Sequence, residues 1–327
     1  MGWASSVGPE DKPSEHPSAP IDASDESTAA AATPAQRGRA PVSELTKRVL
    51  FGVLAGPITV LLVWIGGLPM AVLMSAAAGV AAWELFRMAR ATGAAPLAGL
   101  GICAAALLPL FMVTQPRGVF EFPPALLAGI VLVVLSAAIW LRGTTGRPLS
   151  SVAITIFGIG YTGGLLSFAQ GLRYHRFVVT EMGGAALLLL PVLLTWANDI
   201  GAFFSGRLLG RRKLIPAVSP GKTIAGAIGG LVACLILCWV YVQFVLRPYA
   251  QLSLGPRNLV VFAVVVSAAG QLGDLAESLL KREAGVKNSS GIFPGHGGVL
   301  DRIDSLLFAL PVAWVLLSIP GFLLPVL

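Results

Sequence analysis

Charged residues are scarce in this chain. Asp, Glu, Lys and Arg together make up 12% of its 327 residues, whereas a soluble domain carries about 25%. This deficit argues against a soluble globular protein. Apolar residues make up 55% of the chain and gather in repeated runs of about 18 to 25 residues, the length that a helix needs to cross a bilayer. The runs are not the short alternating segments of a membrane β-barrel. The composition therefore predicts an all-α, polytopic integral membrane protein.

Cysteine is also scarce. Cys103, Cys234 and Cys238 all lie within apolar runs, so the sequence offers neither a disulfide framework nor the spacing of a cysteine metal site. The formal net charge of +7 raises nucleic acid as a partner. The cations, however, cluster in short loops between apolar runs, where they set the topology of a membrane protein. We therefore expect no nucleic acid partner.

The first 42 residues lack any apolar run and are rich in Ala, Pro, Ser, Asp and Glu. Such a segment cannot bury enough surface to fold, and we predict a disordered N-terminal tail over residues 1–42. Because the tail lacks the hydrophobic core of a signal peptide, we expect the first span to stay uncleaved.

Nine apolar runs follow the tail, and each predicts one transmembrane helix. They lie at about 49–67, 70–86, 96–114, 125–141, 151–172, 183–204, 223–246, 258–276 and 305–325. We divide the chain into five N-terminal spans, within residues 43–182, and a catalytic region of four spans, within residues 183–327.

The loop cations predict the orientation. If the N-terminus is cytoplasmic, the loops that follow the even-numbered spans are cytoplasmic and hold most of the Lys and Arg residues, as the positive-inside rule requires. This places the loop 206–222 and the stretch 271–305 on the same, cytoplasmic face. We therefore expect a multi-pass protein of the inner (plasma) membrane with its site on the cytoplasmic side of the C-terminal half.

Four acids lie next to predicted spans. Asp274 ends the eighth span, Asp301 and Asp304 share a helix face at i and i+3, and Asp199 lies late in the sixth span. Ionisable groups at such a depth are costly unless they face a wet cavity and bind something. Carboxylate oxygens are the hard ligands that suit Mg²⁺. For Asp199, an ordinary interfacial residue remains an alternative.

Ser219-Pro220-Gly221-Lys222-Thr223 opens the seventh span. A nucleotide-binding P-loop needs a further glycine at position 216, which is proline, and no strand is expected before it. What remains is a helix N-terminus with hydroxyls and a lysine, where a phosphate can bind. The alternative, an ordinary capped helix with a topology-setting lysine, stays open.

The stretch 271–305 is the most distinctive part of the sequence. Between its acids we expect a polar, glycine-rich loop with cations that can neutralise phosphates and glycines that let the backbone approach a ligand. The residues concerned are Lys281, Arg282, Lys287, His296, Gly297 and Gly298. A solvated loop with salt bridges is the alternative, and it must explain why glycine, acid and base are so dense here.

The spacing of this stretch resembles the signature of the phosphatidate cytidylyltransferases, also called CDP-diglyceride synthases. The pattern runs through Ser278-x-x-Lys281-Arg282-x4-Lys287 and then His296-Gly297-Gly298-x-x-Asp301-Arg302-x-Asp304. The resemblance covers about residues 150–327. Two positions depart from it, since Asn288 stands in place of an expected aspartate and Ala225 in place of an expected glutamate.

The resemblance implies a reaction of CTP with phosphatidic acid that yields CDP-diacylglycerol and pyrophosphate. It implies a metal centre at Asp274, Asp301 and Asp304, with Asp199 as a weaker candidate, holding Mg²⁺ and able to hold a second cation such as K⁺. Phosphates would be held by a second group of residues, Lys222, Lys281, Arg282, Lys287 and Arg302 with Ser219 and Thr223. His296 would orient a phosphate or an acid. Membrane lipids are expected partners. A homodimer is compatible with the family, although no residue here decides it.

Three other readings stay open at this point. The first is a CTP-dependent transferase or kinase that acts on another lipid or polyprenol alcohol. The second is a non-catalytic homologue, suggested by Asn288 and Ala225. The third is a transporter with intramembrane acids, which predicts two repeated halves with broken helices. The sequence shows no such repeat, and its polar residues gather in the C-terminal half.

Overall fold

A computed structural model describes residues 56–292 and 297–326 of the chain. The predicted tail over residues 1–42 and the candidate His296 lie outside the described residues. The described residues belong to one compact unit.

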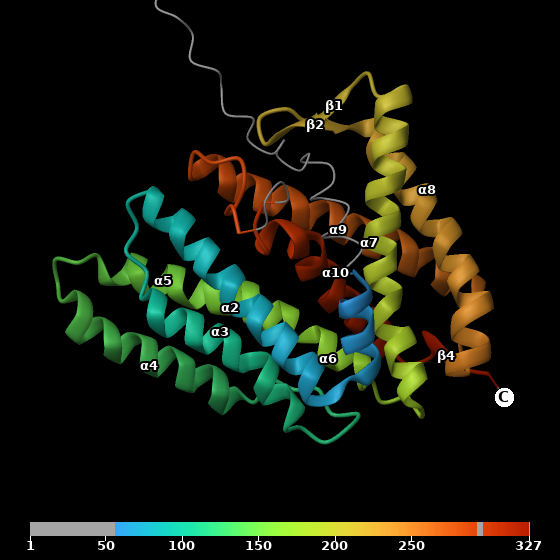
Figure 1. The fold of residues 1–327 in the computed structure, drawn as a ribbon, viewed down its shortest axis with the longest axis horizontal. Coiled ribbons are helices and arrows are strands. Elements are labelled where there is room, and N and C mark those ends of the chain that lie inside the picture. The colour runs from blue at the N-terminus through green and yellow to red at the C-terminus, as the bar shows by residue number, and fades with distance from the viewer. Residues whose placement is uncertain (1–55, 293–296, 327) are drawn as a thin grey trace, which may run out of the picture. The chain divides into compact units, whose positions relative to one another are not determined.

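Helices make up most of the described chain (Figure 1). A first helical segment, Gly56–Ile65, precedes the labelled helices. These are α2 (Gly67–Ala91), α3 (Ala98–Val113), α4 (Pro124–Arg142), α5 (Pro148–Gly158), η1 (Ile159–Gly164), α6 (Phe168–Arg173), α7 (Glu181–Leu209), α8 (Ile224–Tyr241), η2 (Val242–Ala250), α9 (Pro256–Glu283) and α10 (Leu300–Ser318). Two small antiparallel sheets pair β1 (Lys213–Ile215) with β2 (Ser219–Thr223) and β3 (Leu252–Leu254) with β4 (Leu323–Pro325).

The apolar helices agree with an all-α integral membrane protein. Among the described residues, six helical stretches are long and apolar enough to cross a membrane, at 67–91, 124–142, 148–173, 181–209, 224–250 and 256–283. The segment 56–65 and α3 are apolar but shorter. α10 carries Asp301, Arg302 and Asp304 in its first turns. A helix lies in each of the nine predicted ranges, while nine membrane crossings remain a prediction.

Two local predictions were wrong. Lys281 and Arg282 lie in the last turn of α9 and not in a loop. A hydropathy pattern ends the span where charges begin, but the helix continues because Glu277 and Lys281 pair at i and i+4. Residues Ser219–Thr223 form β2, so the predicted helix start is confirmed only for Thr223, the N-cap of α8, which begins at Ile224.

Close backbone contacts bring the helices of the C-terminal half together. A Cβ atom added at Gly201 of α7 would lie 2.7 Å from the Gly229 carbonyl oxygen of α8. One added at Gly273 of α9 would lie 2.5 Å from the Asp304 carbonyl oxygen of α10. Only small residues allow such an approach. These contacts set the acids of α7, α9 and α10 around the same region.

A buried arginine joins the first helical segment to α7. Arg173 is fully buried, and its guanidinium donates to the carbonyl oxygens of Val63 at 3.0 Å and Trp64 at 3.1 Å. It also pairs with Glu181 at 2.7 Å, and Glu181 in turn pairs with Arg117 at 2.8 Å. The Arg173 side chain is 1% exposed and that of Arg117 is 78% exposed. The two arginines share an acid but differ in environment.

We expect Arg173→Met to lower the free energy of unfolding by about 1–3 kcal/mol, because buried carbonyl groups lose their donor. Arg117→Met removes an exposed partner of the same acid and is the matched control, with an expected loss below about 1 kcal/mol. Thermal unfolding of the detergent-purified protein measures both effects. Equal shifts in the two variants would contradict this account of Arg173.

Candidate functional site

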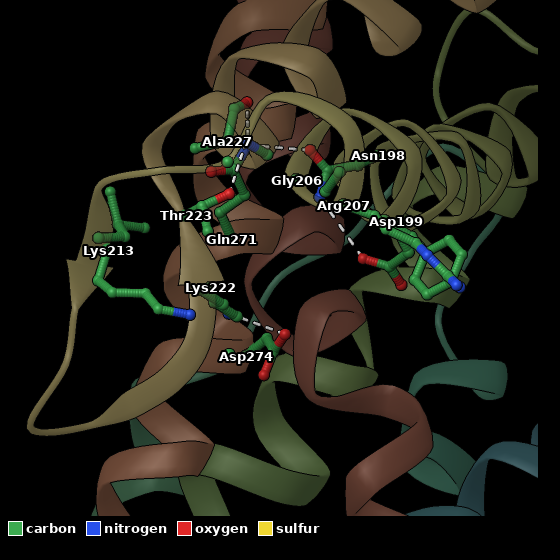
Figure 2. Close-up of a pocket in the computed structure, with 16 residues that line it drawn as sticks. Asn198, Asp199, Gly206, Arg207, Lys213, Lys222, Thr223, Ala227, Gln271 and Asp274 are labelled. Carbon is green, nitrogen blue, oxygen red and sulfur yellow. Dashed lines mark hydrogen bonds and ion pairs between the residues drawn. The ribbon is translucent and has the colours of Figure 1, made fainter.

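A cavity of about 510 Å³ lies between α7, the β1–β2 hairpin, α8 and α9 (Figure 2). Its polar lining includes two of the predicted acids, Asp199 and Asp274, and two of the predicted phosphate ligands, Lys222 and Thr223. Apolar side chains such as Phe203 and Leu214 complete its walls. Asp199 of α7 and Asp274 of α9 are about 75 residues apart in the sequence. They nevertheless line the same polar cavity beside apolar helices.

Lys222 and Asp274 form an ion pair across the cavity (Figure 2). The Lys222 Nζ lies 2.8 Å from Asp274 Oδ2. The ammonium nitrogen is itself shielded from solvent, and among the described residues it makes no well-directed hydrogen bond. An ammonium has three N–H groups, so those that are not directed at Asp274 remain able to donate to an anionic ligand. Because Lys222 lies at the end of β2 and Asp274 in α9, the pair also joins the hairpin to the helix.

The end of β2 leads directly into α8. Thr223 is extended and caps the helix, since its Oγ1 accepts a hydrogen bond from Gly226 N at 3.0 Å. This capping is the typical use of a threonine hydroxyl at a helix start. The Thr223 oxygen thus serves as an acceptor for the cap, and its O–H can still donate a hydrogen bond. Ser219 pairs with Ile215 at the far end of the hairpin and is not among the cavity-lining residues.

A partly buried amide network in the cavity wall was missed by the sequence reasoning. The Asn198 Oδ1 accepts hydrogen bonds from Ser267 Oγ and from Gln271 Nε2, both at 2.9 Å. Gln271 Nε2 also donates to the Ala227 carbonyl at 3.1 Å (Figure 2). The network ties α7, α8 and α9 together next to Asp199. Polar residues within otherwise apolar spans were its sequence signal.

Lys281 is enclosed between two acids. Its ammonium bonds to Glu277 of α9 and lies 2.7 Å from Asp301 Oδ1 of α10. Glu277 is fully buried and Lys281 is 8% exposed. Removing one partner of such a buried group leaves an uncompensated charge. Lys281 therefore joins α9 to α10, and it is not among the cavity-lining residues.

The second oxygen of Asp301 fixes the segment before α10. Asp301 Oδ2 accepts hydrogen bonds from Ser289 N and Ser289 Oγ, both at 2.9 Å, and from Gly298 N at 2.8 Å. Gly297 has a φ of +81°, and a Cβ atom there would lie 2.5 Å from Asp301 Oδ2. Glycine is required at this position. The Asp301 carboxylate is thus held on both oxygens.

The remaining predicted cations differ in position. Arg282 Nε donates to the Val218 carbonyl at 3.3 Å and so ties α9 to the hairpin. Lys287 is exposed. Arg302 exerts its positive charge on Asp199. None of these three is among the cavity-lining residues.

No three His, Cys, Asp or Glu side chains within the described ranges are close enough to ligate one metal ion together. The charge of Asp274 nevertheless acts on both Asp199 and Asp304. Asp304 also interacts with Glu277, whereas Asp301 is bonded on both oxygens. Mg²⁺ usually binds through one or two carboxylates, with water and substrate phosphates as its other ligands. The donor set therefore fits an ion that arrives with a phosphate substrate.

The apolar helices define an integral membrane protein, and its polar cavity is a candidate site for phosphate ligands. The sequence profile of the cytidylyltransferase family matches residues 46–320, and the chain belongs to that family.

Relatives in three bacteria carry the name phosphatidate cytidylyltransferase. The protein from Bacillus subtilis is 35% identical over 282 residues, which are 84% of this chain and 98% of that protein. The protein from Haemophilus influenzae is 46% identical over 153 residues, 45% of this chain and 52% of that protein. The protein from Staphylococcus epidermidis is 44% identical over 154 residues, 47% of this chain and 57% of that protein. The alignments with the latter two thus span about half of those proteins. The family expected from the Ser278-to-Asp304 pattern is confirmed.

We expect Lys281→Met to lower the free energy of unfolding by about 3–5 kcal/mol, because the buried acids Glu277 and Asp301 lose their common cation. Lys287→Met removes an exposed lysine six residues later and should change it by less than about 0.5 kcal/mol. Thermal unfolding in detergent compares the two variants with wild type. A Lys281→Met protein as stable as Lys287→Met would show that Lys281 has no structural role.

Proposed function

We propose that this enzyme transfers the cytidylyl group of CTP to phosphatidic acid and forms CDP-diacylglycerol and pyrophosphate. The observation that carries the proposal is the cavity at the ends of apolar helices. It combines the acids Asp199 and Asp274 with the shielded ammonium of Lys222. A lipid phosphate and a nucleotide phosphate both need such a polar site within reach of the bilayer.

The chemistry needs little proton transfer. A phosphate oxygen of phosphatidic acid attacks the α-phosphorus of CTP, the bond from that phosphorus to the α–β bridging oxygen breaks, and this oxygen leaves as a terminal oxygen of pyrophosphate. The nucleophile is already an anion, so the barrier lies in bringing two anions together and in stabilising charge on the leaving group. Fixed positive groups that point at the developing charge lower this barrier. Lys222 has unengaged N–H donors in the cavity and is the residue best placed to hold a phosphate.

Mg²⁺ fits the same group of residues. One or two of the acids Asp274, Asp199 and Asp304 would hold it together with substrate phosphates and water, and Asp301 would join only by exchanging its present partners Lys281 or Ser289. The ion would neutralise phosphate charge, and a second cation such as K⁺ belongs to the same proposal. In the described residues Asp274 already neutralises Lys222. A ligand that carries both phosphates and a counter-cation would satisfy both members of this pair.

The acyl chains of the lipid would stay in the bilayer. Phe203 lines the cavity and is 58% exposed on α7, so the cavity wall continues into a surface that faces lipid. The proposal includes nine membrane spans, a cytoplasmic N-terminus and a cytoplasmic site in the inner membrane. A homodimer is compatible with this proposal. The departure at Asn288 lies on an exposed residue outside the cavity lining, so it removes no cavity carboxylate.

Purified protein in detergent micelles with phosphatidate should release pyrophosphate and form CDP-lipid only when CTP is present. Chelation of Mg²⁺ should abolish turnover, and Asp301→Ala should lower it by at least about a hundredfold, since the carboxylate orders the site. Turnover with a polyprenol alcohol in place of phosphatidate would point to a kinase of such alcohols. A folded wild-type protein that is inactive on both lipids would support a non-catalytic homologue.

Lys222→Met should lower kcat/KM for CTP by about ten- to a hundredfold. The reason is the loss of a charged hydrogen bond to phosphate, worth about 1.5–3 kcal/mol. Arg211→Gln is the matched control, since Arg211 is an exposed cation next to the hairpin that does not line the cavity. Steady-state kinetics at varied CTP separates the two. Equal effects would mean that general surface charge, and not Lys222, attracts the nucleotide.

A further inference from the structure

Glu84 is a fully buried acid in the N-terminal half of the chain. It lies in α2, far in sequence from the cavity residues. Among the described residues its carboxylate bonds to hydrogen-bond donors and makes no ion pair. A buried carboxylate without a cation is costly unless its oxygens are fully satisfied.

Among the described residues, the donors to Glu84 all lie in the stretch 271–305, more than 200 residues away in sequence. Oε1 accepts hydrogen bonds from Ser290 Oγ and from Val299 N, the latter at 3.0 Å. Oε2 accepts from Ser289 Oγ at 3.0 Å and from Leu300 N at 2.7 Å. Each oxygen thus receives one hydroxyl and one backbone N–H. Glu84 thus binds the segment Ser289–Ser290 and the start of α10 at Val299 and Leu300, and holds both against α2. We call this arrangement the clamp.

The clamp reaches Asp301 through one hydroxyl. Ser289 Oγ lies 3.0 Å from Glu84 Oε2 and 2.9 Å from Asp301 Oδ2. A hydroxyl carries a single proton, so the two carboxylates share it. Arg87, one turn after Glu84 on α2, donates to the Ser289 carbonyl. Ser289 is thus held by α2 on its side chain and on its backbone.

The packing leaves no room beside this acid. A Cβ atom added at Gly298 would lie 2.2 Å from Glu84 Oε1 and 2.1 Å from Ser289 Oγ. The second glycine of the Gly297-Gly298 pair is therefore needed for the clamp itself. This gives that glycine a role beyond backbone approach to a ligand.

We propose that Glu84 is a positioning residue for the cytidylyl transfer. It holds Ser289 and the first turn of α10 so that Asp301 keeps its orientation. The proposal rests on the proposed function for its kinetic readout. It assigns to the N-terminal helices a part in the site beyond membrane anchoring.

Glutamine cannot replace this acid. All four contacts are donated to Glu84, and a glutamine side chain presents an oxygen on one side and an NH₂ group on the other. On the NH₂ side the backbone N–H would lose its acceptor, and the serine hydroxyl would have to turn and accept instead of donating. Glu84→Gln therefore keeps the size of the side chain and breaks half of the clamp.

The test compares Glu84→Gln, Ser289→Ala and the double variant with wild type in the full-length protein. We expect Glu84→Gln to lower kcat about ten- to a hundredfold, as for a misplaced reacting group, while KM for CTP changes less than about threefold. Backbone amides of residues 286–292 should exchange with solvent at least about tenfold faster. The kcat of the double variant should be no lower than that of the less active single variant, because both substitutions break the same link.

Glu181→Gln is the matched control. It removes an acid with two arginine partners at the start of α7, about 27 Å along that helix from Asp199, and should keep wild-type kcat. Wild-type kcat in Glu84→Gln, or additive losses in the double variant, would overturn the proposal. If wild type itself shows no turnover, the proposed function fails, and hydrogen exchange of residues 286–292 still decides whether the clamp exists. If Glu84→Gln does not fold, Ser289→Ala alone carries the kinetic and exchange tests.

Discussion

The pairing of buried charges between α9 and α10 is the constraint on which the site depends. Lys281 bonds to Glu277 on its own helix and to Asp301 on the next. Three charges in a poorly solvated place are tolerated only if each finds a partner of opposite sign or a hydrogen bond. The pairing requires α9 to stay helical as far as Lys281. It also requires α10 to begin where Asp301 can reach it. Asp274, two turns before Lys281, is then left free to face the cavity.

Glycine contacts decide how close the acids come to one another. Gly273 lets α9 touch the Asp304 carbonyl, and Gly201 lets α7 touch α8 at Gly229. Side chains at these positions would push the helices apart and separate Asp199, Asp274 and Asp304. Small residues in membrane helices are usually explained by helix association. Here the same contacts also set the charge density of the cavity, because the acids are their sequence neighbours.

The sequence could predict what depends on composition and local spacing. Apolar runs located a helix in each predicted range, and the spacing from Ser278 to Asp304 identified the family. It could not place Lys281 in a helix, since hydropathy falls at the charges although the helix continues. It missed the β1–β2 hairpin, because these strands are too short to show an alternating pattern and are defined by the contacts between them. Glu84 was overlooked because it is one acid in an apolar span, and its partners lie more than 200 residues away.

These contacts join into one chain of alternating acids and donors. It runs from Glu84 to Ser289, on to Asp301 and Lys281, and ends at Glu277. Each member has at least one partner in this chain, and removing one member leaves a buried neighbour without it, which is costly. Loss of any single member therefore affects the others, which belong to α2, α9, α10 and the segment between the last two. For this reason the N-terminal helices and the C-terminal site act as one unit, even though the residues that line the cavity come from the C-terminal half alone.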